Sequence, residues 1–177
     1  MYEKLMIPLD GSEVAECVLP HVEAFLKNGL VKTAVFIRVL EPVPITLYNS
    51  SFTYDVVPTD GSPASGGKDP YSTNIEYWEK KSAERRNAAK AYLSRLSIPL
   101  NQYGTKIKCE VLEGRVADTL ASYAEQSNVD LILIATHGRS GVGRWLLGSV
   151  ADRVLRSSRV PVFMVNAATS CESGKND

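Results

Sequence analysis

The run Leu131–Ala135 constrains the fold more than any other part of the sequence. All of its residues are apolar, in the order Leu-Ile-Leu-Ile-Ala, with no polar residue between them. A strand with one wet face alternates apolar and polar residues, whereas a strand of a parallel sheet covered by helices on both faces is apolar throughout. We therefore expect this run to be an interior strand of an α/β sheet.

Strand-like and helix-like segments alternate along the rest of the chain. Strand patterns occupy Lys4–Pro8, Thr33–Leu40, Lys106–Leu112, Leu131–Ala135 and Val160–Val165. Helix patterns begin after Ser12, run over Asn74–Leu96, follow Gly114 and run over Ser149–Ser157. Such alternation implies parallel strands joined by right-handed crossovers. The predicted fold class is α/β, an open five-stranded parallel sheet with helices on both faces.

The first helix carries signals at its start, middle and end. Ser12 is a suitable N-cap, and Asn28-Gly29 is a typical helix end. Pro20 lies between them and removes one backbone donor, so we expect a kink or a break there. The more polar composition of Lys106–Leu112 indicates that this strand lies at an edge of the sheet.

One segment interrupts the alternation. Pro42–Thr73 holds five of the nine prolines, together with Gly66-Gly67 and many Ser and Thr residues. Because this composition favours turns and disfavours a packed core, we expect a flexible insertion without regular structure at about 42–73. The predicted organisation is a single domain over residues 1–166, with a polar tail at 167–177.

Charge and hydropathy exclude several classes of partner. Lys and Arg together number 20, as do Asp and Glu, so no net field attracts the chain to nucleic acid or to an anionic membrane. The arginines near the end of the chain include Arg153 and Arg156, which fit the last turns of a helix. No apolar run approaches the roughly 18 residues of a membrane span, and the start lacks a signal-peptide pattern. We expect a cytoplasmic protein.

Histidine and cysteine are too few and too scattered for a transition-metal site. The histidines are His21 and His137, and the cysteines are Cys17, Cys109 and Cys171, all far apart in the sequence. This spacing also indicates no disulfide framework, and we expect Cys17 and Cys109 to be core thiols. Magnesium held by phosphate oxygens needs few protein ligands and stays compatible with the sequence.

A glycine-rich loop follows the apolar strand. The loop from Ala135 to Ser149 holds four glycines between Gly138 and Gly148. Glycine lets the backbone approach a ligand, and the free N–H groups of Gly148, Ser149 and Val150 at the start of a helix favour phosphate. The Ser149 hydroxyl can add a donor, and Arg139 or Arg144 can add a cation. The alternative is a flexible turn in which Ser149 caps the helix.

The loop is neither a P-loop nor a dinucleotide fingerprint, because no G-x-x-x-x-G-K-[ST] occurs and Leu146 stands where G-x-G-x-x-G needs its third glycine.

The order of the motifs resembles the universal stress protein family. The resemblance rests on Ile7-Pro8-Leu9-Asp10-Gly11-Ser12, Ala135-Thr136-His137-Gly138, nine residues, Gly148-Ser149, and Pro161-Val162-Phe163-Met164-Val165. It implies a Rossmann-like sheet of strand order 3-2-1-4-5.

The resemblance also implies a nucleotide site. The nucleotide-binding branch of that family carries G-x-x-G, nine residues, then G-[ST], and here Ala135 replaces the first glycine. Alanine keeps its N–H donor and adds only a methyl group, so we expect binding to survive. Pro8 and Leu9 would wall the adenine, Asp10 would meet the ribose or phosphates, and the Val39 backbone would meet the adenine edge. The remaining implied contacts are Ala135, His137, Gly138, Arg139, Gly148, Ser149 and Val150.

The expected ligand is ATP, or ADP or AMP, with Mg²⁺ held through the phosphates. No activated water or charge stabiliser is evident, so we expect a regulatory stress-response module that is at most a weak ATPase. The resemblance further implies a homodimer through Val160–Val165. Two alternatives remain, namely an interaction dimer of the same fold that binds no nucleotide, and an ATP-dependent enzyme with a second substrate.

Overall fold

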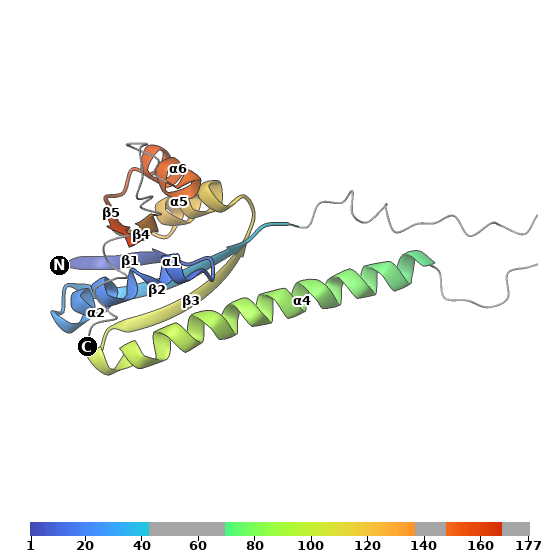
Figure 1. Ribbon diagram of the computed structural model, residues 1–177, viewed down its shortest axis with the longest axis horizontal. Coiled ribbons are helices and arrows are strands. Elements are labelled where there is room, and N and C mark those ends of the chain that lie inside the picture. Colours follow the sequence, from blue (N-terminus) through green and yellow to red (C-terminus); the bar gives the residue numbers. More distant parts are fainter. Residues whose placement is uncertain (43–69, 137–147, 168–177) are drawn as a thin grey trace, which may run out of the picture.

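The computed structural model describes residues 1–42, 70–136 and 148–167, excluding the side chains of 70–76. Its centre is a five-stranded sheet in the order β3-β2-β1-β4-β5, in which all neighbouring strands are parallel (Figure 1). The strands are β1 Tyr2–Pro8, β2 Val31–Leu40, β3 Lys106–Glu113, β4 Leu131–Thr136 and β5 Val162–Asn166. The predicted α/β class and strand order are confirmed. β3 lies at an edge, as its polar composition predicted.

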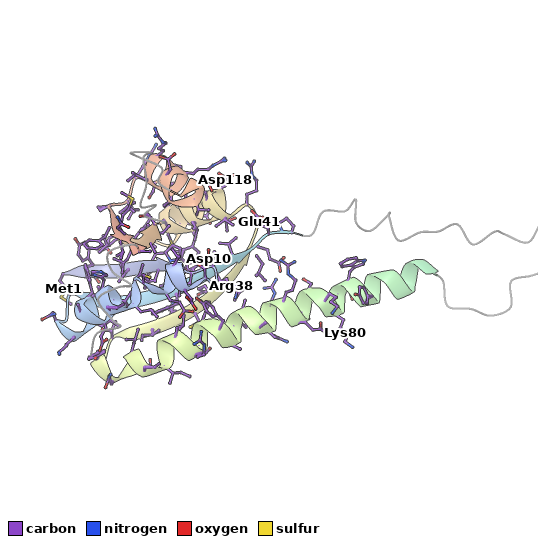
Figure 2. The ribbon with its side chains drawn as sticks, viewed as in Figure 1. Met1, Asp10, Arg38, Glu41, Lys80 and Asp118 are labelled. Atoms are coloured by element: carbon purple, nitrogen blue, oxygen red, sulfur yellow. The ribbon has the colours of Figure 1, made fainter. Side chains whose placement is uncertain are left out.

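Helices cover both faces of the sheet. They are α1 Glu13–Glu16, α2 Leu19–Lys27, α4 Pro70–Ser97, α5 Val116–Gln126 and α6 Ser149–Ser157, with a 3₁₀ turn η1 at Ile98–Tyr103. One face packs against α2 and α4, and the opposite face packs against α5 and α6. The end of α4 that includes Lys80 extends past the sheet (Figure 2). No helix in residues 1–42, 70–136 or 148–167 has the length and apolarity to span a membrane.

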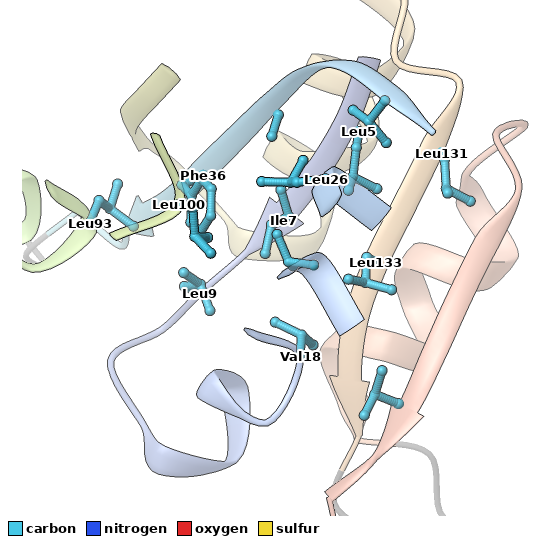
Figure 3. Close-up of a cluster of buried hydrophobic side chains, with 14 residues drawn as sticks. Leu5, Ile7, Leu9, Val18, Leu26, Phe36, Leu93, Leu100, Leu131 and Leu133 are labelled. Carbon is cyan, nitrogen blue, oxygen red and sulfur yellow. The ribbon is translucent and has the colours of Figure 1, made fainter. Parts of the chain in front are cut away.

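The core forms because successive residues of the inner strands point to opposite faces. On β1, Leu5 and Ile7 join the cluster beneath α2 and α4 (Figure 3), whereas Met6 joins the cluster beneath α5 and α6. On β4, Leu133 and Ile132 divide between the two clusters in the same way. The apolar run that suggested an interior strand is therefore interior, with β1 beside it in the middle of the sheet.

The first predicted helix is divided in two, as Pro20 suggested. The Ser12 hydroxyl accepts from the N–H of Ala15 at 3.1 Å and caps α1. α2 then begins at Leu19, with Pro20 in its first turn, where the missing N–H has no intrahelical partner to lose. Gly29, which follows the C-cap, has φ +63° and ends α2.

Some predicted boundaries are wrong. α4 begins at Pro70, so the last residues of the segment expected to be irregular, Pro70–Thr73, are helical. The predicted boundary is misplaced because proline is typical of turns, although it is also favoured in the first turn of a helix. β5 begins at Val162 rather than Val160. Residues 43–69 and the tail from 168 lie outside the described residues.

The two core cysteines differ. Cys109 is a half-buried free thiol whose Sγ lies 3.3 Å from the Ser97 hydroxyl. Cys17 is buried, as expected, but it is disulfide-bonded. The expectation of a core thiol is therefore confirmed for Cys109 only in part, because it is half-buried, and is wrong for Cys17.

Candidate functional site

A cavity of about 320 Å³ opens at the carboxyl ends of β1 and β4, where the strand order reverses. We call it the β1–β4 cavity. Its lining residues are Pro8, Leu9, Asp10, Ala15, Ile37, Val39, Val116, Leu120, Ile134, Ala135, Gly148, Ser149, Val150 and Ala151. In open α/β sheets this crevice is where ligands bind. Its volume is at the lower end of the range of about 300–1,000 Å³ for ligand pockets.

The cavity brings together the predicted site residues that the structure describes. These are Pro8, Leu9, Asp10, Val39, Ala135, Gly148, Ser149 and Val150. They come from four segments, at the ends of β1, β2 and β4 and at the start of α6. The three strand segments meet because β1 lies between β2 and β4 in the sheet. The other predicted contacts, His137, Gly138 and Arg139, lie outside the described residues.

Most of the described cavity wall is apolar. Ile37 and Val39 lie two residues apart on β2, so they share one strand face and line the cavity together. Val116 and Leu120 of α5 also line it. Ile134 and the half-buried Ala135 of β4 complete the wall. A wall of this kind can hold a flat, weakly polar ring and exclude water from it.

Asp10 supplies the cavity's carboxylate. Its Oδ1 accepts from both the N–H and the hydroxyl of Ser12, at 2.8 and 2.6 Å, which closes a tight turn after β1. The N–H of Leu9 donates to the Ile37 carbonyl at 2.8 Å and fixes the approach to this turn. Within the described ranges no donor meets Oδ2 of Asp10, so that oxygen is free to accept from a ligand.

The N-terminus of α6 supplies the cavity's hydrogen-bond donors. Gly148 is the N-cap, and the first bond of the helix runs from the Asp152 N–H to the Gly148 carbonyl at 2.9 Å. The N–H groups of Ser149, Val150 and Ala151 precede that bond and have no partner within the helix. The alternative in which Ser149 caps the helix is therefore wrong. These N–H groups and the helix dipole make this corner of the cavity suitable for an anion.

Six lining residues escaped the sequence reasoning. They are Ala15, Ile37, Val116, Leu120, Ile134 and Ala151. Ile37 and Ile134 could have been found, because Ile37 shares a strand face with Val39 and Ile134 precedes Ala135. Ala15 and Ala151 carry no comparable signal, since small apolar residues near a helix start are common in any core.

The described lining is unsuited to holding a metal ion by itself. Asp10 is its one titratable side chain. Among the described residues no group of three or more His, Cys, Asp or Glu side chains could hold a metal ion. A divalent cation in this cavity would therefore depend on oxygens of the ligand.

Known proteins resemble the chain both in sequence and in structure. The model of the universal stress protein family matches residues 53–166. Universal stress protein MJ0531 of Methanocaldococcus jannaschii is 30% identical over 165 residues, covering 93% of this chain and 82% of that protein. Universal stress protein MJ0577 of the same organism is 28% identical, covering 96% of this chain and 98% of that protein.

Solved structures share the fold. The structure of MJ0577 superposes with a TM-score of 0.65 at 26% identity, covering 94% of this chain and 96% of that one. A universal stress protein in complex with cAMP gives 0.54 at 17% identity, covering 94% and 98%. A family protein of Arabidopsis thaliana with AMP bound gives 0.57 at 9% identity, covering 98% and 97%. The last two likenesses concern the fold alone.

The family model covers most of the chain, and the two relatives align with 93% and 96% of it. The chain belongs to the universal stress protein family.

Proposed function

We propose that this protein binds an adenine nucleotide in the β1–β4 cavity and acts as a nucleotide-dependent regulatory module of the stress response. The observation that carries the proposal is the convergence of Asp10, Val39 and the Gly148–Val150 segment on one cavity at the reversal of strand order. An apolar wall, one carboxylate and a helix N-terminus are the groups that base, ribose and phosphate require.

The adenine ring lies against the apolar wall. Pro8 and Leu9 form one side, and Val39 meets the edge of the ring through its backbone N–H and C=O groups. Backbone groups at a strand end can read the donor and acceptor pattern of the base without burying a charge.

The ribose and phosphates lie at the polar end. Oδ2 of Asp10 accepts from ribose hydroxyls, and the N–H groups of Ser149 and Val150 donate to phosphate oxygens. By the family resemblance His137, Gly138 and Arg139, outside the described residues, complete the phosphate contacts. Two proteins of the same fold with AMP or cAMP bound are consistent with this ligand class.

Ala135 keeps the site compatible with a nucleotide. It is half-buried in β4, pairs with Val165, lines the cavity and differs from glycine by a single methyl group. That methyl narrows the wall slightly compared with glycine and removes no donor.

The chemistry proposed for the site is binding, with slow hydrolysis at most. Mg²⁺ would be held through phosphate oxygens, where it would screen their charge. Asp10 is the one titratable side chain of the described lining, and its Oδ1 is committed to the Ser12 turn. With Oδ2 assigned to the ribose, neither oxygen of Asp10 is left to act as a general base for water.

Calorimetry on ligand-free protein tests the proposal. A ligand of about 31 heavy atoms at roughly 0.3 kcal/mol per atom gives a binding free energy near −9 kcal/mol, or micromolar affinity. We expect a saturable heat signal with ATP and Mg²⁺, and adenine nucleotide in the extract of protein isolated from cells. The absence of both at tens of micromolar protein would favour the interaction dimer with no nucleotide.

We also propose a homodimer through the edge of β5. Phe163 and Met164 are 41% and 37% exposed on this strand, and its outer edge has no partner strand in the described chain. An exposed apolar edge of this kind favours pairing with a second copy. Light scattering is expected to give twice the monomer mass, and a monomer mass at all concentrations would contradict the proposal.

A further inference from the structure

Arg38 lies between two cavity residues of β2 but on the other face of the sheet. Ile37 and Val39 line the β1–β4 cavity, whereas the side chain of Arg38 points toward α4, on the same face as Phe36 (Figure 2). Arg38 is therefore outside the cavity, and no sequence motif singles it out.

The Arg38 guanidinium lies against the turn that carries Asp10. Gly11 has φ +95°, and a Cβ built on it would lie 3.0, 3.2 and 3.3 Å from Nη2, Cζ and Nη1 of Arg38. Three such similar distances place the planar group broadside against the Gly11 backbone. Glycine is required here both for its φ and for this close approach.

Tyr92 of α4 also contacts the guanidinium of Arg38. The Cζ atom of Arg38 lies 5.1 Å from the centre of the Tyr92 ring, within the range of a cation–π contact. Among the described residues no group meets the buried Tyr92 hydroxyl with hydrogen-bond geometry. Burial is the main cause of its raised pKa, and the nearby Glu16 carboxylate raises the pKa further. The ring is thus fixed by packing against the core rather than by its hydroxyl.

The Arg38 guanidinium contacts the Gly11 turn through packing rather than through an ion pair. Among the described residues no carboxylate lies within 4.0 Å of the Arg38 guanidinium, so no ion pair ties Arg38 to Asp10. A guanidinium is flat and weakly hydrated, and it can fill the space between an aromatic ring and a backbone turn. Lysine or an aliphatic side chain cannot present the same flat surface.

We propose that Arg38 is a positioning residue for the nucleotide site. The Arg38 guanidinium packs against both the Tyr92 ring and the Gly11 backbone. This packing holds the Gly11 turn in place and so fixes the direction in which the neighbouring Asp10 presents Oδ2 to the cavity. The inference rests on the proposed nucleotide binding and adds to it a residue that touches no ligand. It also connects α4 to the site.

The test compares two matched arginines. Arg95 also contacts the Tyr92 ring, at 5.6 Å, and forms an ion pair with Glu16 at 3.3 Å, but the three atoms nearest to a Cβ built on Gly11 all belong to Arg38. Arg38→Met and Arg95→Met each remove a guanidinium and keep an unbranched apolar stem. Both variants are titrated with ATP and Mg²⁺ by calorimetry, and their thermal unfolding is measured without ligand.

We expect Arg38→Met to weaken ATP binding about tenfold and Arg95→Met to leave it unchanged, with similar unfolding temperatures for both. Wild-type affinity in Arg38→Met would overturn the inference. Equal losses in the two variants would overturn it as well, since the cause would then be general packing around Tyr92. The titration of the wild-type protein tests the proposed function separately: if the wild type binds no nucleotide, the proposed function itself fails.

Discussion

The two oxygens of Asp10 have different partners, which allows its structural and ligand-binding roles to be separated. Oδ1 accepts two hydrogen bonds from Ser12, whereas Oδ2 has no donor in the described chain, and Asp10 lines the β1–β4 cavity. Asp10→Asn keeps one oxygen for the Ser12 bonds but replaces the other with an amide nitrogen, which donates and cannot accept. Asp10→Ala removes both roles.

The expected magnitudes follow from these contacts. At an exposed site two hydrogen bonds contribute about 1 kcal/mol together, so Asp10→Ala lowers the free energy of unfolding by that amount. Hydrogen bonds that involve a charged group contribute about 1.5–3 kcal/mol, so either substitution weakens ATP binding by roughly ten- to a hundredfold. Asp10→Asn is expected to leave the free energy of unfolding within about 0.5 kcal/mol of wild type.

Urea unfolding of ligand-free protein and calorimetric titration with ATP measure the two quantities on the same samples. Asp10→Asn should lose affinity and keep stability, whereas Asp10→Ala should lose both. Wild-type ATP affinity in Asp10→Asn would refute the assignment of Oδ2 to the ligand. A large stability loss in Asp10→Asn would instead show that the charge of the carboxylate, rather than its geometry, holds the turn.

Three further predictions concern other parts of the fold. Ala135→Val adds bulk to the cavity wall at a strand position that tolerates β-branching, so ATP affinity should fall about tenfold while urea unfolding stays near wild type; unchanged affinity would place the ligand elsewhere. Burial raises the pKa of the Tyr92 hydroxyl, so the unfolded chain loses this proton at lower pH than the folded chain, and the free energy of unfolding falls as pH rises above about 10. Tyr92→Phe should reduce that fall, measured by urea unfolding between about pH 8 and 11. An identical fall in the variant would show that Tyr92 is not its source. Met164→Lys puts a charge on the β5 edge and should give monomers by light scattering with unchanged circular dichroism, whereas an intact dimer would move the interface away from β5.

Features set by local physics could be predicted from the sequence. The apolar run in β4 identified an interior strand, Ser149–Ser157 matched α6 at both ends, and Pro20 marked the break between α1 and α2. Each depends on a pattern within a few residues. The polar residues of the cavity could also be predicted from local patterns. Asp10 comes just after the first strand pattern, and Gly148 lies at the end of the glycine-rich loop.

Features set by tertiary packing could not be predicted in this way. The contact between Arg38 and Tyr92 joins residues that are far apart in sequence, and nothing in either local pattern indicates it. The start of α4 at Pro70 was missed because proline and serine suggested a loop, although proline also fits a first helical turn. The disulfide-bonded state of Cys17 likewise depends on which cysteines the fold brings together.

The central claim, that a nucleotide occupies the β1–β4 cavity, is tested most directly by following backbone amide resonances of the ligand-free protein during titration with ATP and Mg²⁺. The account predicts the largest shifts at Asp10, Val39, Ser149 and Val150, which line the cavity, and none on the outer edge of β3. Saturable shifts centred on any other surface, with those amides unmoved, would contradict it.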